Sequence, residues 1–200
     1  MTLLVGSAFD KAITVLATGD QAVAADLLAS DDEIDAMHVS LTEQCYELLV
    51  RESPRATDLR LVVSVIRVLT ALERIGDLCL RIAKTADDHS LLTAHPGVFA
   101  VLRELGRCVR ERFGIVQEAW SANSIEPLAR LETAEALEDF ADPLMSRILE
   151  LDGPDAARVA VSAFVVGRSL DRIGDHTQIL SARLHYLITG DNVYLADEVI

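Results

Sequence analysis

Aromatic residues, glycine, proline and lysine are scarce in this chain. Aromatic side chains form 4% of its 200 residues, and there are 10 glycines and 5 prolines. All-β sandwiches need many turn residues and collagen needs glycine at every third position, so this composition argues against both. Half of the residues are hydrophobic, which argues against disorder and supplies a sizeable core. The composition therefore favours a mainly helical globular chain.

Positive charge is also scarce, because lysine occurs only at Lys11 and Lys84 and the net charge is −14. Phosphate backbones would be repelled, so we expect no nucleic-acid partner; metal cations and basic proteins remain open. No uncharged apolar run approaches the ~18 residues of a membrane span, which argues against membrane insertion. The first eleven residues have no basic segment ahead of their apolar run, so they do not resemble a signal peptide.

The pattern of cysteines favours a cytoplasmic protein. Cys45, Cys79 and Cys108 form no CxxC pair and lie among apolar residues at helical spacing. We interpret them as reduced core thiols of a cytoplasmic protein.

Apolar residues recur at helical spacing through most of the chain, with breaks at glycine, proline and asparagine. The pattern predicts an all-α antiparallel bundle of six long helices. We place these helices at roughly 3–18, 21–52, 55–88, 97–121, 124–150 and 155–189, with a loose tail at 191–200. Pro143 lies inside the fifth stretch, which predicts a kink or a helix in two pieces.

Two stretches of the chain match when one is shifted by 98 residues. Residues 59–77 and 157–175 share nine of 19 positions, and Glu-Arg-Ile-Gly-Asp at 73–77 lies over Asp-Arg-Ile-Gly-Asp at 171–175. A glycine inside a helix costs about 1 kcal/mol relative to alanine, so its repetition indicates a backbone that another element approaches closely. The repeat predicts two tandem three-helix bundles, 1–93 and 94–190.

The repeated motif carries paired carboxylates. Glu73 and Asp77 are four residues apart, as are Asp171 and Asp175, so each pair shares one helix face. Two further pairs lie on neighbouring predicted helices, at Asp32 and Asp35 and at Asp139 and Asp142. Oxygen-only sites built from four carboxylates would suit Mg²⁺, Ca²⁺, Mn²⁺ or iron.

Other interpretations of these acids stay open at this point. Acidic pairs at this spacing are common on solvated helix faces, and arginines such as Arg74 and Arg172 could neutralise them in place of metal. The motifs of nucleophilic, nucleotide-dependent and dinucleotide-dependent enzymes are absent, so we expect no catalysis and no organic cofactor. A metal-dependent enzyme and an inert helical scaffold remain the alternatives.

The repeated motif sits in a longer pattern that resembles a known family. Three segments resemble the PhoU family, whose members are bacterial regulators of phosphate uptake. They are Pro54…Asp58-Leu59-Arg60…Glu73-Arg74-Ile75-Gly76-Asp77, Asp171 through His176, and Tyr186-Leu187-Ile188-Thr189-Gly190. The resemblance runs from about Ala12 to Gly190.

This resemblance implies two three-helix bundles, a cytoplasmic homodimer and no catalysis. It also implies a role in restraining the phosphate-starvation response, through a phosphate ABC transporter with its ATPase and a sensor histidine kinase. Some members of the family bind iron, Mg²⁺ or Mn²⁺ through E/D-x-x-x-D motifs. Here those motifs are Glu73-x-x-x-Asp77 and Asp171-x-x-x-Asp175, with Asp32, Asp35, Asp139 and Asp142 at the companion positions.

Overall fold

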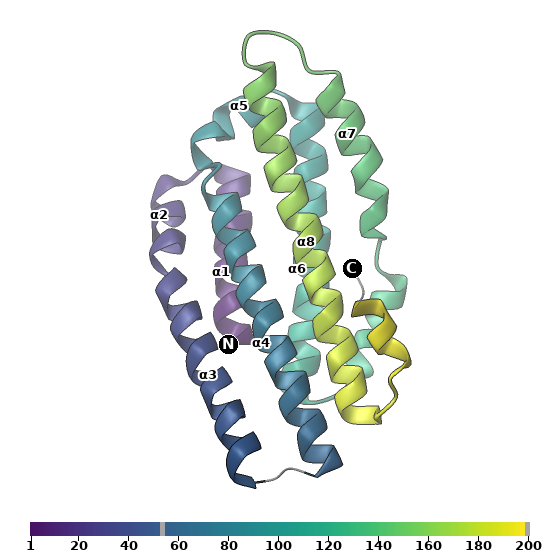
Figure 1. The fold of residues 1–200 in the computed structure, drawn as a ribbon. Coiled ribbons are helices and arrows are strands. Elements are labelled where there is room, and N and C mark those ends of the chain that lie inside the picture. The colour runs from purple at the N-terminus through teal and green to yellow at the C-terminus, as the bar shows by residue number, and fades with distance from the viewer. Residues whose placement is uncertain (53–54, 199–200) are drawn as a thin grey trace.

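A computed structural model of the chain describes residues 1–52 and 55–198, and within these ranges it contains helices and no strand (Figure 1). Pro54 of the motif quoted above and residues 199–200 of the tail lie outside the described residues. The α-helices are α1 (Thr2–Thr18), α2 (Gln21–Ala29), α3 (Asp31–Glu52), α4 (Ala56–Ala83), α5 (His89–Thr93), α6 (Pro96–Ala122), α7 (Ala141–Leu149) and α8 (Ala156–Thr189). Short 3-10 helices are η1 (Ala86–Asp88), η2 (Glu126–Thr133), η3 (Leu137–Phe140) and η4 (Val193–Glu198).

The all-α class and the six helical stretches are confirmed, with two stretches broken. The predicted helix at 21–52 is divided at Ser30 into α2 and α3. Asp20 begins α2 by accepting hydrogen bonds from the backbone amides of Ala22 and Val23, at 2.8 and 3.1 Å. Three acidic residues in the first turn of α3 favour its separate start, because they complement the helix dipole.

The fifth stretch differs more from its prediction. Residues 126–133 and 137–140 form the 3-10 helices η2 and η3, and the α-helix α7 begins only at Ala141. Pro143 is the third residue of α7, where the amide that proline lacks would have no partner within the helix. The predicted helix is therefore interrupted before Pro143 and not at Pro143 itself.

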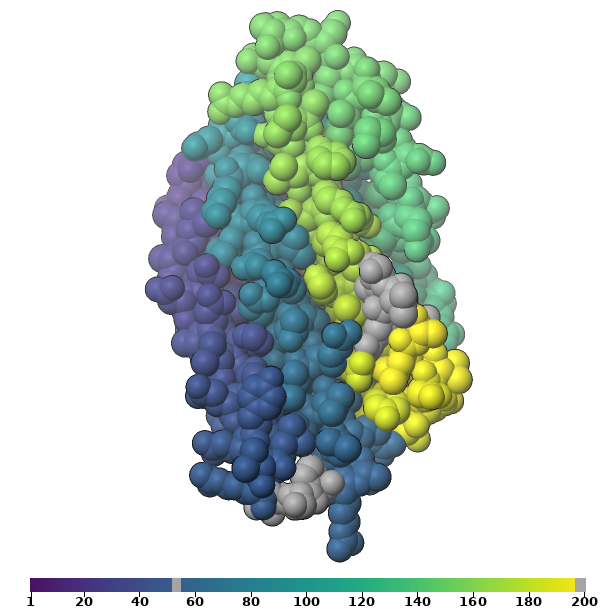
Figure 2. Space-filling view, viewed as in Figure 1, coloured from purple at the N-terminus to yellow at the C-terminus, as the bar shows by residue number. Residues whose placement is uncertain are grey.

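The helices form two trios that pack against each other. In the first trio, α1 and α3 lie on α4; in the second, α6 and α7 lie on α8. Helices α4 and α8 run antiparallel side by side through the middle of the molecule, and α1 also contacts α6 (Figure 1). Helix α3 covers the outer side of α4, and α7 stands on the opposite flank (Figure 2).

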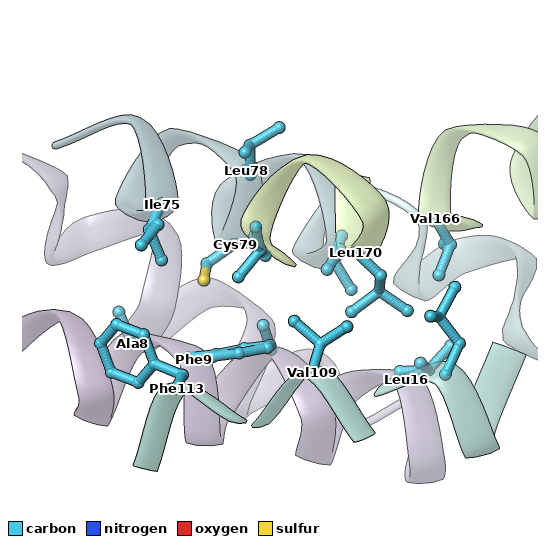
Figure 3. Packing of buried hydrophobic residues seen from close by; sticks show 14 of the residues in the cluster. Ala8, Phe9, Leu16, Ile75, Leu78, Cys79, Val109, Phe113, Val166 and Leu170 are labelled. Carbon is cyan, nitrogen blue, oxygen red and sulfur yellow. The ribbon is translucent and has the colours of Figure 1, made fainter. Parts of the chain in front are cut away.

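One continuous apolar core joins the trios. Figure 3 shows Phe9 of α1 and Phe113 of α6 beside Ile75 and Cys79 of α4, with Leu170 of α8 close by. The two phenyl rings meet edge to face, with centroids 6.0 Å apart. Burying each such side chain contributes about 1.5–3 kcal/mol, so separating the trios would expose a large part of what stabilises them.

The C-terminal tail is more ordered than predicted over its described part. Residues 193–198 form η4, which packs on α8, and the ring of Tyr194 stacks on His185 with centroids 4.1 Å apart. An aromatic residue five positions after the end of α8 gives the chain a reason to fold back. No helix within the described ranges combines the length and the apolar character needed to cross a membrane.

Candidate functional site

The two glycines of the repeated motif mark where an outer element approaches a central helix. A Cβ atom at Gly76 of α4 would lie 3.1 Å from the Cδ1 atom of Ile34 in α3. A Cβ atom at Gly174 of α8 would collide with the Cδ1 atom of Leu137 in η3. Each glycine therefore admits an apolar side chain from the neighbouring element, as the repeated glycine predicted. Ile34 and Leu137 fix which acids of the outer elements face the motif.

Contact between Ile34 and Gly76 brings carboxylates of α3 beside those of α4. Burial, followed by the negative charge of Asp77, raises the pKa of Glu73, and Asp35 raises it further. Burial also raises the pKa of Asp31, together with the charges of Asp35, Asp77 and Asp32. We call Asp31, Asp35, Glu73 and Asp77 the first acid cluster. These raised pKa values show that the cluster carries negative charge in a partly desolvated setting.

The first acid cluster includes one residue that the sequence interpretation missed. Asp32 and Asp35 are predicted as the companion pair, and Asp35 does influence Glu73. The charges of Asp35, Asp77 and Asp32 all raise the pKa of Asp31, which is half-buried, whereas Asp32 and Asp35 are both exposed. The sequence carried a signal for Asp31, because residues 31 and 35 are four apart and so share a helix face.

Arginine supplies only part of the counter-charge at the first acid cluster. The Nε atom of Arg74 lies 3.6 Å from a Glu73 carboxylate oxygen, and another of its nitrogens lies 3.6 Å from Asp77. The more remote Lys84 lowers the pKa of Asp31. The charge of His38 also lowers the pKa of Glu73, so four carboxylates face one arginine, one lysine and one histidine, which leaves a surplus of negative charge.

The second motif has a different charge balance. Arg172 lies 2.9 Å from a carboxylate oxygen of Asp175, and Arg168 pairs with Asp171. The pKa of Asp175 is raised by burial and then by Asp171, while Arg172 and Arg168 lower it. We call Asp171 and Asp175 the second acid pair. In the repeat, Thr70 of α4 stands where α8 has Arg168, so only the second copy has an arginine for each acid.

The outer element of the second trio presents a different acid from the one predicted. A hollow of about 550 Å³ lies between η2, η3 and α8, and its charged lining residues are Arg112, Glu132, Glu138, Asp171 and Asp175. Asp139 and Asp142 do not line this hollow, and both are exposed. Because Leu137 takes the place of Ile34, Glu138 follows it as Asp35 follows Ile34. The irregular path of residues 126–140 hid this register from the sequence pattern.

The donor chemistry of the first acid cluster fits a hard cation. Carboxylate oxygens are the ligands that Mg²⁺ and Mn²⁺ prefer, and a cation would relieve the surplus charge. In the present side-chain conformations, however, no three of the predicted acids in the described residues bring oxygens within 4.8 Å of one another. Binding a cation there would require the carboxylates to turn inward and Arg74 to turn away.

A compact group with that spacing lies elsewhere, at Glu104, Cys108 and Glu135. Arg107 occupies its centre: it donates to Glu104 at 2.9 Å, and its guanidinium lies 3.8 Å from Glu135. Burial and the hydrogen bond to Glu135 raise the pKa of the Cys108 thiol to about 11, so this sulfur is not a thiolate ligand at neutral pH. We interpret the group as an arginine-centred ion-pair network.

Comparison with known proteins finds similar chains along nearly the whole length of this one. A family model described as the PhoU domain matches residues 1–86. The phosphate-specific transport system accessory protein PhoU homolog 1 of Thermotoga maritima is 28% identical over 96% of this chain and 84% of its own length. The corresponding homolog 1 of Mycobacterium leprae is 29% identical over 94% of this chain and 85% of its own length.

Solved structures agree with the sequence relatives. The crystal structure of PhoU from Pseudomonas aeruginosa superposes with a TM-score of 0.84 at 25% identity, covering 96% of this chain and 93% of that one. The phosphate transport system regulatory protein PhoU from Streptococcus pneumoniae gives a TM-score of 0.79 at 22% identity, over 96% and 91% of the two chains, and shows the shared fold. The duplicated trios, the repeated motif and these matches agree: along nearly its whole length, the chain is similar to proteins of the PhoU family.

Proposed function

We propose that this protein is an accessory protein of a phosphate-specific transport system and restrains the phosphate-starvation response. The observation that carries the proposal is similarity along nearly the whole chain to relatives named as phosphate-specific transport system accessory proteins. Both trios are included in these matches, so the relatives share the entire two-trio architecture and not one helix pair.

The mode of action that we propose is binding, without catalysis. The protein would act as a cytoplasmic homodimer that contacts the ATPase of a phosphate ABC transporter and a sensor histidine kinase. The long helices and the shared core support this role, because they give a rigid body with extended faces on which two partners could dock at once.

Deletion of the gene tests the regulatory role. In cells grown at high phosphate, deletion should raise expression from phosphate-starvation promoters, and a plasmid copy should restore repression. A promoter fusion and quantitative RNA measurements give the readout. Unchanged expression in the deletion strain would contradict the proposal.

We further propose that the first acid cluster binds a divalent cation or iron, whereas the second acid pair does not. The difference in charge supports this distinction, since Arg168 and Arg172 balance the second pair and Thr70 leaves the first cluster with a surplus. A cation bound between Glu73 and Asp77 of α4 and Asp35 of α3 would hold the two helices together and so stabilise the first trio.

Titration of Mn²⁺ into metal-free protein tests the cation site. Melting temperature should rise with Mn²⁺ in the wild type, and the rise should be lost in Asp77→Asn. Thr70→Arg, which copies the arginine of α8 into α4, should weaken the response without removing a carboxylate. Asp139→Asn serves as the matched control, because Asp139 is exposed and does not line the hollow. An equal rise in all four proteins would rule the site out.

A further inference from the structure

The repeat preserves a second pair of residues, one turn apart, outside the acidic motif. Arg60 and Ser64 of α4 correspond to Arg158 and Ser162 of α8. On α8, both side chains hold one carboxylate: Arg158 Nε donates to Asp88 Oδ1 at 2.6 Å, and Ser162 Oγ donates to Asp88 Oδ2. The Asp88 side chain is 17% exposed, so this carboxylate is largely enclosed by its donors.

On α4 the same pair has no carboxylate. Applying the shift of 98 residues to Asp88 gives Tyr186, near the end of α8. Because α4 and α8 are antiparallel, Tyr186 lies beside the first turns of α4, and its ring centroid is 5.7 Å from the Arg60 guanidinium carbon. An aromatic ring thus stands at the place of the acceptor.

The donors of α4 are consequently unsatisfied. Arg60 Nε and Ser64 Oγ are buried and have no hydrogen-bond partner among the residues that the structure describes, and Ser64 is 0% exposed. A buried polar group without a partner costs about 1–3 kcal/mol, which the pair Arg158 and Ser162 avoids through Asp88.

Packing holds Arg60 in this position. Gly190 ends α8 in the left-handed conformation, with φ of 78°, and a Cβ atom there would collide with the Arg60 guanidinium. The close approach of this turn confines the guanidinium to the end of α8. The donors are therefore positioned before any ligand arrives, which reduces the entropy lost on binding.

We propose that Arg60 and Ser64 form a binding site for a small oxyanion of the size of phosphate or sulfate. The carboxylate of Asp88 in the other copy is the internal model of the ligand: one oxygen accepts from the guanidinium and a second accepts from the hydroxyl. A planar guanidinium with an adjacent hydroxyl suits an oxyanion, since each supplies donors and neither supplies a competing negative charge. To admit the ligand, the side chain of Tyr186 turns aside. The inference stands independently of the proposed function.

Equilibrium dialysis of the full chain against radiolabelled inorganic phosphate tests the site. We expect one phosphate per chain in the wild type and at least a tenfold weaker affinity in Arg60→Gln and in Ser64→Ala. The matched control, Arg158→Gln, should still bind one phosphate. No binding to the wild type, or undiminished binding to Arg60→Gln, would overturn the proposal.

Two further variants change the residue at the acceptor position of each copy. Their outcome does not depend on whether Arg60→Gln folds stably. Tyr186→Asp supplies the missing carboxylate, so it should abolish phosphate binding and raise the melting temperature. Asp88→Ala empties the occupied pair, so the chain should bind a second phosphate. Retained phosphate binding in Tyr186→Asp would contradict the site. Competition with sulfate supports the oxyanion class, whereas displacement by acetate alone would overturn it in favour of a carboxylate ligand.

Discussion

The two copies of the three-helix unit have kept their central helices and changed what surrounds them. Helices α4 and α8 share the repeated motif, the glycine and the arginine-serine pair, and each packs on the other. Their outer elements differ: α3 is a regular helix of 22 residues, whereas residues 126–140 follow 3-10 turns before the nine-residue α7. A central helix is constrained by neighbours on several sides, while an outer element needs only one apolar face.

The balance of charged side chains also differs between the two copies. The first copy keeps a surplus of carboxylates at its glycine, and the second balances each acid of its motif with an arginine. At the arginine-serine pair the order is reversed, since the second copy binds an internal carboxylate and the first lacks one. The two copies therefore share one framework, and the differences between Thr70 and Arg168 and between Asp88 and Tyr186 make their charge unequal.

Replacing the matching leucines by alanine should cause the largest loss of unfolding free energy. The loss should be similar in both copies. Leu72 and Leu170 occupy equivalent positions and are 1% and 0% exposed. Because both lie in one core, each change to alanine should cost about 2–5 kcal/mol of unfolding free energy. Urea denaturation followed by circular dichroism should show a single transition in each variant. Two separate transitions would mean that the trios unfold independently.

Replacing each motif glycine by leucine should lower stability by different amounts in the two copies. Gly76→Leu would push against Ile34, a stiff β-branched residue that is 2% exposed in a regular helix, at a cost of about 1–3 kcal/mol. Gly174→Leu would meet the end of the flexible Leu137 side chain on a 3-10 turn, so its loss of stability should be smaller. Thermal unfolding of the two variants gives the comparison. A larger loss at Gly174 would show that η3 is the stiffer partner.

Replacing His176 by leucine, its counterpart Leu78 in the first copy, should change how stability depends on pH. Burial lowers the pKa of His176 to about 4, and the charges of Arg172 and Arg74 lower it too. An unfolded histidine titrates near pH 6.5, so the wild type loses stability as the pH falls from about 6.5 towards 4. His176→Leu should remove on the order of 1–2 kcal/mol of that loss, after allowance for the partial exposure of the ring. Parallel pH profiles of the two proteins would contradict this effect.

Neutralising Glu73 should have the smallest effect. Burial and Asp77 raise the pKa of Glu73, so its ionised form is disfavoured in the folded protein. In the presence of a chelator at pH 7, Glu73→Gln should stabilise the protein by a few tenths of a kcal/mol, the size of a like-charge repulsion on a helix. This gain should vanish as the pH falls below the ordinary carboxylate pKa, because the wild-type side chain is then protonated as well. Destabilisation at pH 7 would show that the interaction with Arg74 outweighs the repulsion.

The acidic residues show which parts of the candidate site the sequence pattern could predict. Glu73, Asp77, Asp171 and Asp175 are placed on their helices by spacing alone, and the repeated glycines predict a close approach at both. The partners across that approach were harder to find, because a run such as Asp31-Asp32-Glu33-Ile34-Asp35 permits several registers. The contact between Ile34 and Gly76 sets the register of α3 on α4, and the contact between Leu137 and Gly174 places η3, with Glu138, beside α8.

The sequence by itself determined the helical class, the duplication and the residues that each central helix repeats, since these depend on periodicity and identity along the chain. Tertiary structure decided that α4 and α8 share a core, and that Asp88 satisfies Arg158 while Arg60 faces Tyr186. Those outcomes depend on contacts between residues about 70 to 130 positions apart, which helical spacing does not encode because it relates only residues on the same helix.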